Sequence, residues 1–318
     1  MSDKKTIAVI GATGAQGGGL CAAILHDAQG GFACRAITRD PHKDKAQALA
    51  ARGAEVVKAD LDDVESLTRA FQGAHGAYCV TNFWEHFSAE KEHQQARNLA
   101  AAADAAGVKH VIWSTLEDTR KLMTDDDQRM PILQGKFRVP HFDAKGEADR
   151  HFSHLSSTFL LASFYWDNLY TVGLMPKKGP DGKYEWTLPM GEKRLAGIAA
   201  EDIGKAAYGI FKAGRDYIGK TVGLAAEHLT IEEMSTTLSK ALGIGPIAYH
   251  AVEPSVYRSF GFPGADEMGN MFQVYRDFER EVLGIRDTDI TRRLNPELQT
   301  FEQWIALHKD QLLKAAAG

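Results

Sequence analysis

The chain has 318 residues, too many for one small domain and enough for a nucleotide-binding domain with a smaller second lobe. Its net charge is −5 and no basic residues cluster on one stretch, which argues against direct binding to nucleic acid or to an anionic membrane. No uncharged apolar run is long enough to span a bilayer, and the first strand begins too early for a signal peptide. Three cysteines without a Cys-x-x-Cys pair fit free thiols in a reducing compartment, so we expect a cytoplasmic protein.

A glycine-rich turn follows the first predicted strand. The apolar residues 7–10 lead into Gly11-Ala12-Thr13-Gly14-Ala15-Gln16-Gly17, and a helix is expected over about 15–28. Glycines at this spacing let the backbone turn sharply and approach a pyrophosphate. The start of the helix would direct unpaired N–H groups and its positive dipole end at the phosphates. The order of strand, glycine turn and helix therefore predicts dinucleotide binding.

Strands and helices then alternate as far as residue 165. Further strands are expected at 32–38, 55–60, 76–81, 110–115 and 157–162. Further helices are expected between these strands: one ends at about residue 52, one begins after a cap at Asp62, and two span about 88–106 and 141–153. This alternation predicts an α/β fold with a doubly wound, Rossmann-type parallel sheet. Ligands of such sheets bind where the strands end, so the residues after each strand are the candidates for a site.

Capping residues mark the starts of some helices. Asp62 with Glu65 is expected to begin the third helix, whose buried face would hold Val64, Leu67, Ala70 and Phe71. Capping boxes are also formed by Thr230 with Glu233 and by Thr300 with Gln303.

The alternation loosens beyond residue 165. A turn-rich segment at 175–182 precedes a strand at 184–188, and short strands near 221–226 and 247–252 complete a mixed α/β lobe. We therefore expect a dinucleotide-binding domain over residues 1–165. A smaller substrate or partner lobe would span residues 166–318, and the chain could cross between the two.

The end of the second strand bears on the choice of cofactor. Arg39 stands there with Lys43 four residues on, and two cations can hold the 2′-phosphate of NADP. NADP(H) is therefore favoured. Asp40 keeps NAD open, because a shift of one residue in the strand boundary would put a carboxylate at the position that contacts the ribose 2′-OH.

Other strand ends supply further contacts. Asp60 and Leu61 follow the third strand, where the adenine edge would lie. Thr81, Asn82 and Phe83 follow the fourth strand and would line the ribose on the nicotinamide side.

The set of residues that hydride-transfer chemistry usually needs is incomplete in this sequence. Short-chain reductases usually carry Tyr-x-x-x-Lys on one helix face, and here the segment reads His141-Phe142-Asp143-Ala144-Lys145. The lysine is present and the tyrosine is absent, although a histidine can donate a proton near neutral pH. Lys145 and His141 are thus the catalytic candidates. Ser114 and Thr115 end the fifth strand, where a hydroxyl could polarise a carbonyl, and are equally explained as strand residues. Tyr78 and Tyr165 could supply a phenol, although core packing explains each better; Tyr165 is also counted among the cofactor contacts.

A metal site is not predicted. His151 and His154 have helical spacing, but no cysteine or carboxylate set joins them.

Several of these segments carry a family resemblance. The chain resembles the NmrA-like family of atypical short-chain dehydrogenases/reductases, and within it a subgroup that is represented in animals. The segments His141–Glu147 and Gly261–Ala265 together are specific for it. The matching segments are 11–18, 38–41, 53–57, 80–85, 141–147, 261–265 and 294–296.

The resemblance implies a two-domain Rossmann-type protein that binds NADP(H). The family's phosphate-loop, 2′-phosphate and ribose residues correspond to Gly11, Thr13, Gly14, Gln16 and Gly17, to Arg39 and Lys43, and to Lys145. The chain departs from the subgroup at His42, where a more basic residue is usual. It departs again at Trp166, which we expect beside the nicotinamide pocket, where it would alter what fits.

Two functional hypotheses follow from the resemblance. In the subgroup the protein typically senses the NADPH/NADP ratio, changes partners or oligomeric state, and has no established dehydrogenase reaction. A homodimer and a regulatory protein partner are thus expected. The alternative is an NADPH-dependent reductase of a small carbonyl, quinone or imine, because related branches such as quinone reductases work without the tyrosine–lysine pair.

Overall fold

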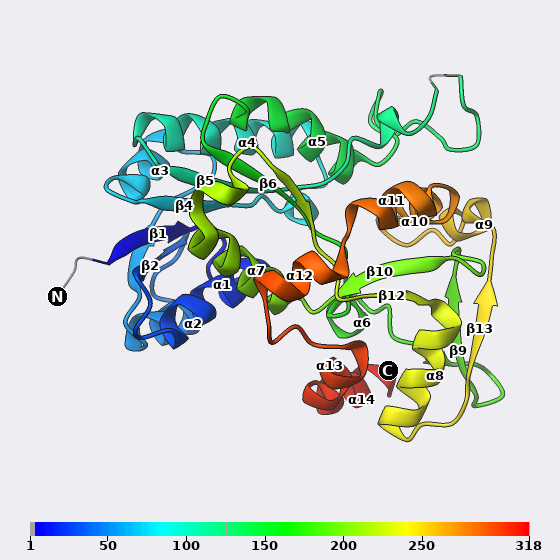
Figure 1. The fold of residues 1–318 in the computed structure, drawn as a ribbon. Helices are drawn as coiled ribbons and strands as arrows, with labels where there is room; N and C mark the ends of the chain where they lie inside the picture. Colours follow the sequence, from blue (N-terminus) through cyan, green and yellow to red (C-terminus); the bar gives the residue numbers. More distant parts are fainter. Residues whose placement is uncertain (1–3, 125, 318) are drawn as a thin grey trace.

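The computed structural model describes residues 4–124 and 126–317, and its framework is a seven-stranded parallel sheet with helices on both faces (Figure 1). The strand order is β11-β6-β5-β4-β1-β2-β3. The strands are β1 (Lys5–Val9), β2 (Phe32–Thr38), β3 (Glu55–Lys58), β4 (Gly76–Cys79), β5 (His110–Thr115), β6 (Ser157–Leu161) and β11 (Thr221–Gly223). The predicted doubly wound sheet is confirmed. Its order reverses between β1 and β4, where such sheets bind ligands.

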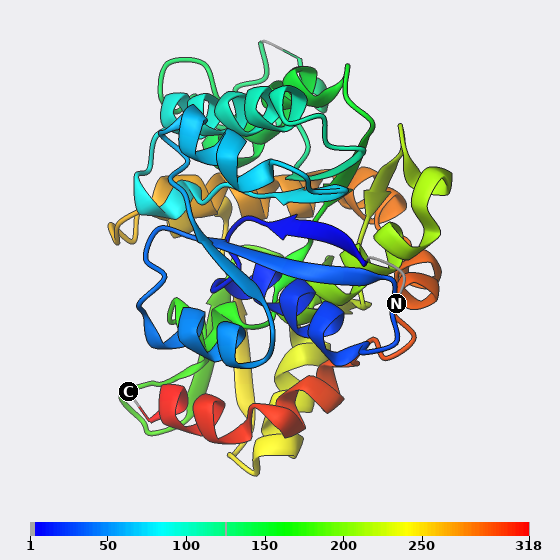
Figure 2. The same cartoon turned by 90° about the vertical axis from the view of Figure 1, so that its left-hand side faces the viewer.

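Helices cover the sheet in two layers, which Figure 2 shows above and below it. One layer holds α1 (Ala15–His26), α2 (Asp44–Ala51) and α7 (Ala200–Ala213), and the other holds α3 (Val64–Phe71), α4 (Ala89–Ala105) and α5 (Pro140–Phe152). The side chains of β1 show why helices cover both faces of the sheet. Ile7 and Val9 pack into the cluster beneath α1, whereas Ala8 and Ile10 pack into the cluster beneath α3 and α4. A strand buried on both faces has a continuous apolar sequence, as residues 7–10 do.

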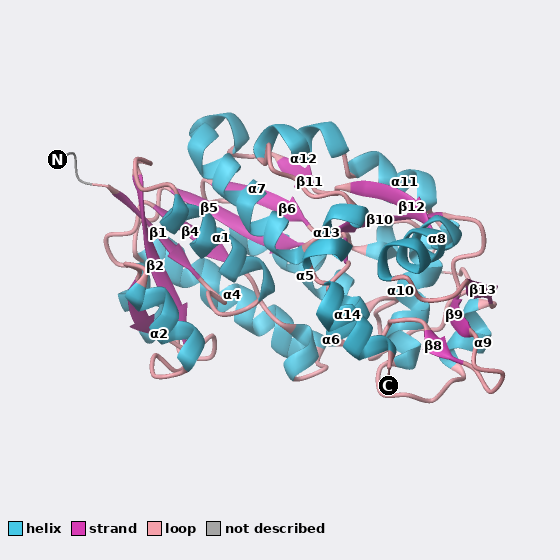
Figure 3. Ribbon diagram, turned by 90° about the horizontal axis from the view of Figure 1, so that it is seen from below, coloured by secondary structure: helices cyan, strands magenta, loops and turns pink. Residues whose placement is uncertain are grey.

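The second lobe lies beyond the carboxyl ends of the central strands (Figure 3). Within the described part of the chain it holds two small sheets, β12-β10-β7 and β13-β9-β8. Their strands are β7 (Phe164–Tyr165), β8 (Lys177–Lys178), β9 (Tyr184–Leu188), β10 (Arg194–Ile198), β12 (Glu227–Thr230) and β13 (Ile247–Ala251). Helices of this lobe include α6 (Asn168–Thr171), α8 (Ile231–Leu242), α9 (Pro254–Arg258), α10 (Ala265–Asp277), α11 (Glu279–Ile285), α12 (Thr288–Leu294), α13 (Phe301–Leu307) and α14 (Lys309–Ala316). The capping boxes predicted at Thr230 and Thr300 are confirmed.

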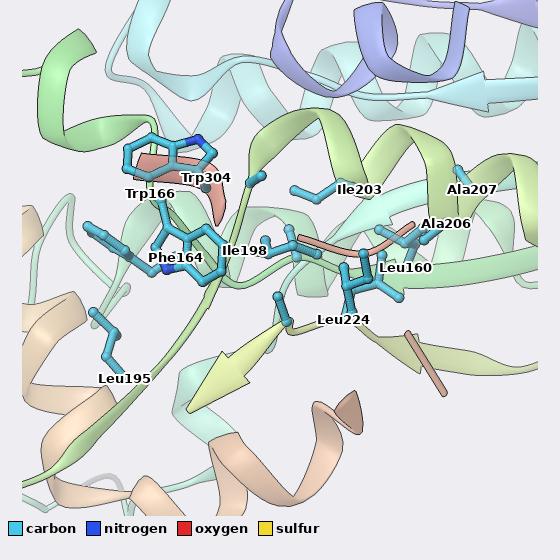
Figure 4. Close-up of a cluster of buried hydrophobic side chains, with 14 of the residues drawn as sticks. Leu160, Phe164, Trp166, Leu195, Ile198, Ile203, Ala206, Ala207, Leu224 and Trp304 are labelled. Atoms are coloured by element: carbon cyan, nitrogen blue, oxygen red, sulfur yellow. The ribbon is translucent and has the colours of Figure 1, made fainter. Parts of the chain in front are cut away.

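One hydrophobic cluster joins the two lobes (Figure 4). Leu160 of β6 and Ile203 of α7 belong to it together with Phe164 of β7 and Trp304 of α13. Because β6 leads within three residues into β7, the cluster continues from the central sheet into the second lobe. The carboxyl ends of the strands are thereby held at a fixed place beside the second lobe.

Trp166 belongs to this cluster and not to a ligand pocket, so its predicted place beside the nicotinamide is wrong. It is buried, and its ring lies 5.2 Å from that of Phe301 and 6.0 Å from that of Trp304. A Cβ at Gly197 of β10 would clash with the indole, so a glycine is needed for the ring to lie on this strand.

Other predictions also fail, for reasons of tertiary structure. Asp63, not Asp62, caps α3 by accepting from the Ser66 amide at 3.1 Å, because the chain makes a turn at Asp60 before the helix begins. Val64 is 37% exposed and does not face the core. The strand near 221–226 is β11, which pairs with β6 in the central sheet and not in the small lobe, so the chain crosses back after residue 165.

The structure also bears on the cysteines and on the absence of a long apolar run. Cys21, Cys34 and Cys79 are free and buried, as predicted. In the described residues, no helix has both the length and the apolar character needed to cross a membrane.

Helix α1 packs on α7 with almost no space between the two backbones. A Cβ at Gly19 of α1 would clash with the backbone of Glu201, and a Cβ at Gly204 of α7 would clash with the backbone of Gln16, Gly19 and Leu20. A Cβ at Gly18, by contrast, would meet its nearest neighbour, the Ala12 carbonyl oxygen, at an ordinary 3.5 Å.

We expect Gly19→Ala to lower the free energy of unfolding by about 1–3 kcal/mol, because the helices must move apart. Gly18→Ala is the matched control in the same helix and should leave stability unchanged or raise it by up to about 1 kcal/mol through helix propensity. Urea unfolding of both variants provides the measurement. Equal stability of the two variants would contradict this account of the helix contact.

Candidate functional site

A cleft of about 1240 Å³ runs along the carboxyl ends of the central strands and is bordered by the second lobe. It is lined by both catalytic candidates and by all the cofactor-binding candidates of the sequence analysis: Gly11, Thr13, Gly14, Ala15, Gln16, Gly17, Arg39, Lys43, Asp60, Leu61, Thr81, Asn82, Phe83, His141, Lys145 and Tyr165. The fold thus brings all of them to one cavity, while their roles in binding or catalysis stay predictions.

The glycine turn forms the floor of the cleft. Gly11 has a φ of +64°, which favours glycine, and its carbonyl accepts from the Gly14 amide at 2.8 Å. A Cβ at Gly17 would clash with the Gly11 carbonyl, so α1 approaches the turn more closely than any side chain allows. No side chain caps the start of α1 and no acidic residue lies in its first turn. This end of the helix therefore suits a pyrophosphate.

Gln16 links three elements across the site. Its amide nitrogen donates to the Tyr165 hydroxyl, and its amide oxygen accepts from the hydroxyls of Tyr78 and Ser114, the latter at 2.8 Å. Burial raises the pKa of Tyr165 to about 12 and raises the pKa of Tyr78 further. Both phenols therefore keep their protons at neutral pH.

Lys145 of α5 is held by a carboxylate that the sequence analysis missed. Its Nζ lies 2.7 Å from Oε1 of Glu92 in α4 and donates to the Thr81 hydroxyl at 2.6 Å. Burial of Glu92 raises its pKa, but the Lys145 ammonium, the nearby His86 ring at 3.5 Å and hydrogen bonds from Lys145 and Thr81 outweigh burial and lower that pKa to about 2. Sequence analysis could have identified Glu92 as a glutamate on the buried face of an alanine-rich helix.

His141 has a similar partner. Its backbone amide donates to Oε1 of Glu267 at 2.8 Å, and its Nδ1 bonds to the same oxygen. Both side chains are buried, and Glu267 lies in α10 of the second lobe, so this contact joins the lobes. Among the described residues nothing bonds to Nε2 of His141, which leaves this nitrogen for a ligand. Glu267 lies two residues beyond a segment of the family resemblance and was not identified.

Arg39 also forms an ion pair within the cleft. Its Nη1 and Nη2 each lie 2.9 Å from an oxygen of Glu85, in the short 3-10 helix η1 (Phe83–Glu85) that follows β4. Asp40, the residue that kept NAD open, accepts from the His42 amide at 3.0 Å and so closes its own turn. Lys43 forms no ion pair with any residue in the described ranges.

The far wall of the cleft is apolar and was not foreseen. Trp84 lies with its ring 4.9 Å from that of His141. Residues of the second lobe complete this wall: Trp186, Tyr257, Phe260, Phe262, Met268 and Met271. The cleft thus has a polar end at the strand termini and an aromatic end between the lobes.

Comparisons with known proteins agree with the family resemblance and with the fold. A family model described as NmrA-like family matches residues 3–305. The NmrA-like family domain-containing oxidoreductase FrzB of Cladobotryum sp. is 27% identical over 280 residues, which cover 84% of this chain and 82% of that protein.

Solved structures give the same picture. The crystal structures of Nmra, a negative transcriptional regulator, in complex with NAD and in complex with NADP each match with a TM-score of 0.76 and 26% identity. Each match covers 96% of this chain and 95% of that chain.

The Lys145–Glu92 pair leads to a prediction on stability. Lys145→Met should lower the free energy of unfolding by about 3–5 kcal/mol at pH 7, because Glu92 is left buried without its counter-charge. The double variant Lys145→Met/Glu92→Gln should recover part of this loss, since no uncompensated charge remains. Urea unfolding measures both; a double variant no more stable than the single variant would contradict the pairing.

Proposed function

The chain belongs to the NmrA-like family, and from this we propose that it binds NADP(H) and responds to the NADPH/NADP ratio as a regulator. We further propose that it does so without the standard dehydrogenase reaction. The observation that carries the proposal is a cleft that is complete for a dinucleotide yet has His141, tied to the second lobe, where the usual phenolic acid would stand.

The geometry supports a pyrophosphate cofactor at the glycine turn. The uncapped start of α1 would hold the pyrophosphate, and Lys145 would contact the ribose on the nicotinamide side. Nmra, which shares 26% of its residues with this chain, has been crystallised with NAD and with NADP. Arg39 and Lys43 favour NADP, since both line the cleft and Asp40 is engaged in its own turn.

The contacts that join the lobes support a regulatory role. A ligand shifts an equilibrium only by binding two states unequally, so the reduced and oxidised cofactor must meet residues that differ between those states. His141–Glu267 spans the lobes directly at the nicotinamide side, so its geometry is suited to such a role. We include a homodimer, a regulatory protein partner and a cytoplasmic location in this proposal.

A reductase is the second candidate function, and the aromatic end of the cleft favours it. A carbonyl, quinone or imine could lie against Trp84 and the second lobe, close to Nε2 of His141. NADPH would supply the hydride to the substrate, and His141 would supply the proton to its oxygen or nitrogen, with Glu267 orienting the ring. The relative FrzB carries the name oxidoreductase.

Cofactor binding can be tested at Arg39. Arg39→Ala should weaken NADPH binding by roughly 10- to 100-fold, because charge-assisted bonds to the 2′-phosphate are lost, and should change NADH binding far less. Calorimetry with both cofactors gives the two affinities. Arg69→Ala, an equally exposed arginine of α3 outside the cleft, is the control. Equal losses for NADPH and NADH would overturn the assignment of Arg39.

The regulator and the reductase predict different behaviour with NADPH. For the regulator, sedimentation velocity should give different masses for the protein saturated with NADPH and with NADP+. The absorbance of NADPH should then stay constant with a panel of quinones, aldehydes and imines. Turnover that is lost in both Lys145→Ala and His141→Gln would contradict the regulator and support the reductase.

A further inference from the structure

Glu85 competes with the cofactor for Arg39. The two side chains form a bidentate ion pair between the loop after β2 and η1 after β4, and both line the cleft. Glu85 also accepts from the side-chain amide of Asn82 at 3.3 Å, which holds the carboxylate at this place. Any group that Arg39 binds therefore lies within reach of Glu85.

The two cofactors would meet this pair differently. The 2′-phosphate of NADP(H) is an anion and cannot share Arg39 with a carboxylate at contact distance without strong repulsion. Binding it requires Glu85 to move away from the guanidinium. The 2′-OH of NAD(H) is a neutral donor, and a carboxylate accepts from such a hydroxyl. The ion pair can therefore stay intact when NAD(H) is bound.

We propose that Glu85 is a specificity-determining residue, which accepts from the ribose of NAD(H) and gives up Arg39 to the 2′-phosphate of NADP(H). The site then takes both cofactors, and the proposal rests on the dinucleotide binding proposed above. Asp40 also lines the cleft, but its carboxylate closes its own turn through the His42 amide, whereas the Glu85 carboxylate lies on the Arg39 guanidinium itself. Lys43 needs no such exchange, as it has no ion pair with the described residues.

Movement of Glu85 away from Arg39 would also affect the aromatic end of the cleft. Trp84 is the neighbouring residue of η1 and contacts the ring of His141. Its indole lies close to Gly264, where an added Cβ would be 3.6 Å from it. Of the five tryptophans, Trp84, which is 41% exposed, and the buried Trp186 line the cleft, so tryptophan fluorescence reports on the aromatic end of the cleft when a ligand binds.

The test compares NADP+ and NAD+ binding by calorimetry in the wild type and in Glu85→Gln. We expect the ratio of NADP+ to NAD+ affinity to rise by about tenfold in the variant, because Arg39 no longer has a competing anion. In the wild type the two cofactors should change tryptophan fluorescence to different extents, and this difference should disappear in Glu85→Gln.

Glu55→Gln controls for the loss of one negative charge. Glu55 pairs with Arg35 outside the cleft and is 57% exposed, against 47% for Glu85, and its variant should keep the wild-type ratio. An unchanged ratio in Glu85→Gln, or the same rise in Glu55→Gln, overturns the role of Glu85 while cofactor binding stands. A wild type that binds neither cofactor overturns the proposed function itself.

Discussion

The backbone contact of helix α1 with the segments on either side of it is the constraint on which the rest of the structure depends. Gly17 lies against the Gly11 carbonyl, and Gly19 lies against the backbone of α7. A side chain at either place would push the helix away from the sheet. The same contact fixes the uncapped start of α1 at the cleft, where the free amides face outward. Stability and cofactor site therefore depend on the same short stretch of glycines.

Ion pairs decide the electrostatics of the cleft more than isolated cations do. Three of the four basic residues on which the sequence analysis based the site have a glutamate partner: Arg39 with Glu85, Lys145 with Glu92, and His141 with Glu267. Lys43 has no ion pair with the described residues. An anionic group that binds Arg39 must therefore displace Glu85 or bind beside it. The buried Lys145–Glu92 pair resists such exchange, since separating it leaves a charge without solvent. The exposed Arg39–Glu85 pair permits exchange because water can screen both partners. If NADP(H) binds as we propose, the cofactor would rearrange one end of the cleft while the other end stays fixed.

The sequence predicted what depends on local pattern. The strands at 32–38, 110–115 and 184–188 have the predicted bounds, because each is an apolar or β-branched run closed by turn residues. The cleft residues were found because they follow strand ends in a sheet of known topology. The glutamate partners were missed because they come from distant parts of the chain: Glu85 lies 46 residues from Arg39, and Glu267 lies 126 residues from His141. The burial of Trp166 was missed likewise, since it depends on a glycine in β10 and on α13.

The ionisable groups also bear on whether a residue of the cleft can donate a proton to a substrate. A phenol works as a proton donor in short-chain reductases when a nearby lysine lowers its pKa. Here burial raises the pKa of Tyr165 to about 12, and the charge of Lys145 is compensated by Glu92. The Tyr165 phenol is thus not prepared for proton transfer. His141 differs, because Glu267 orients its ring and leaves Nε2 without a partner among the described residues. In the proposed reductase, this nitrogen is therefore the proton donor that we propose, and a change in the contact between the lobes would alter it directly.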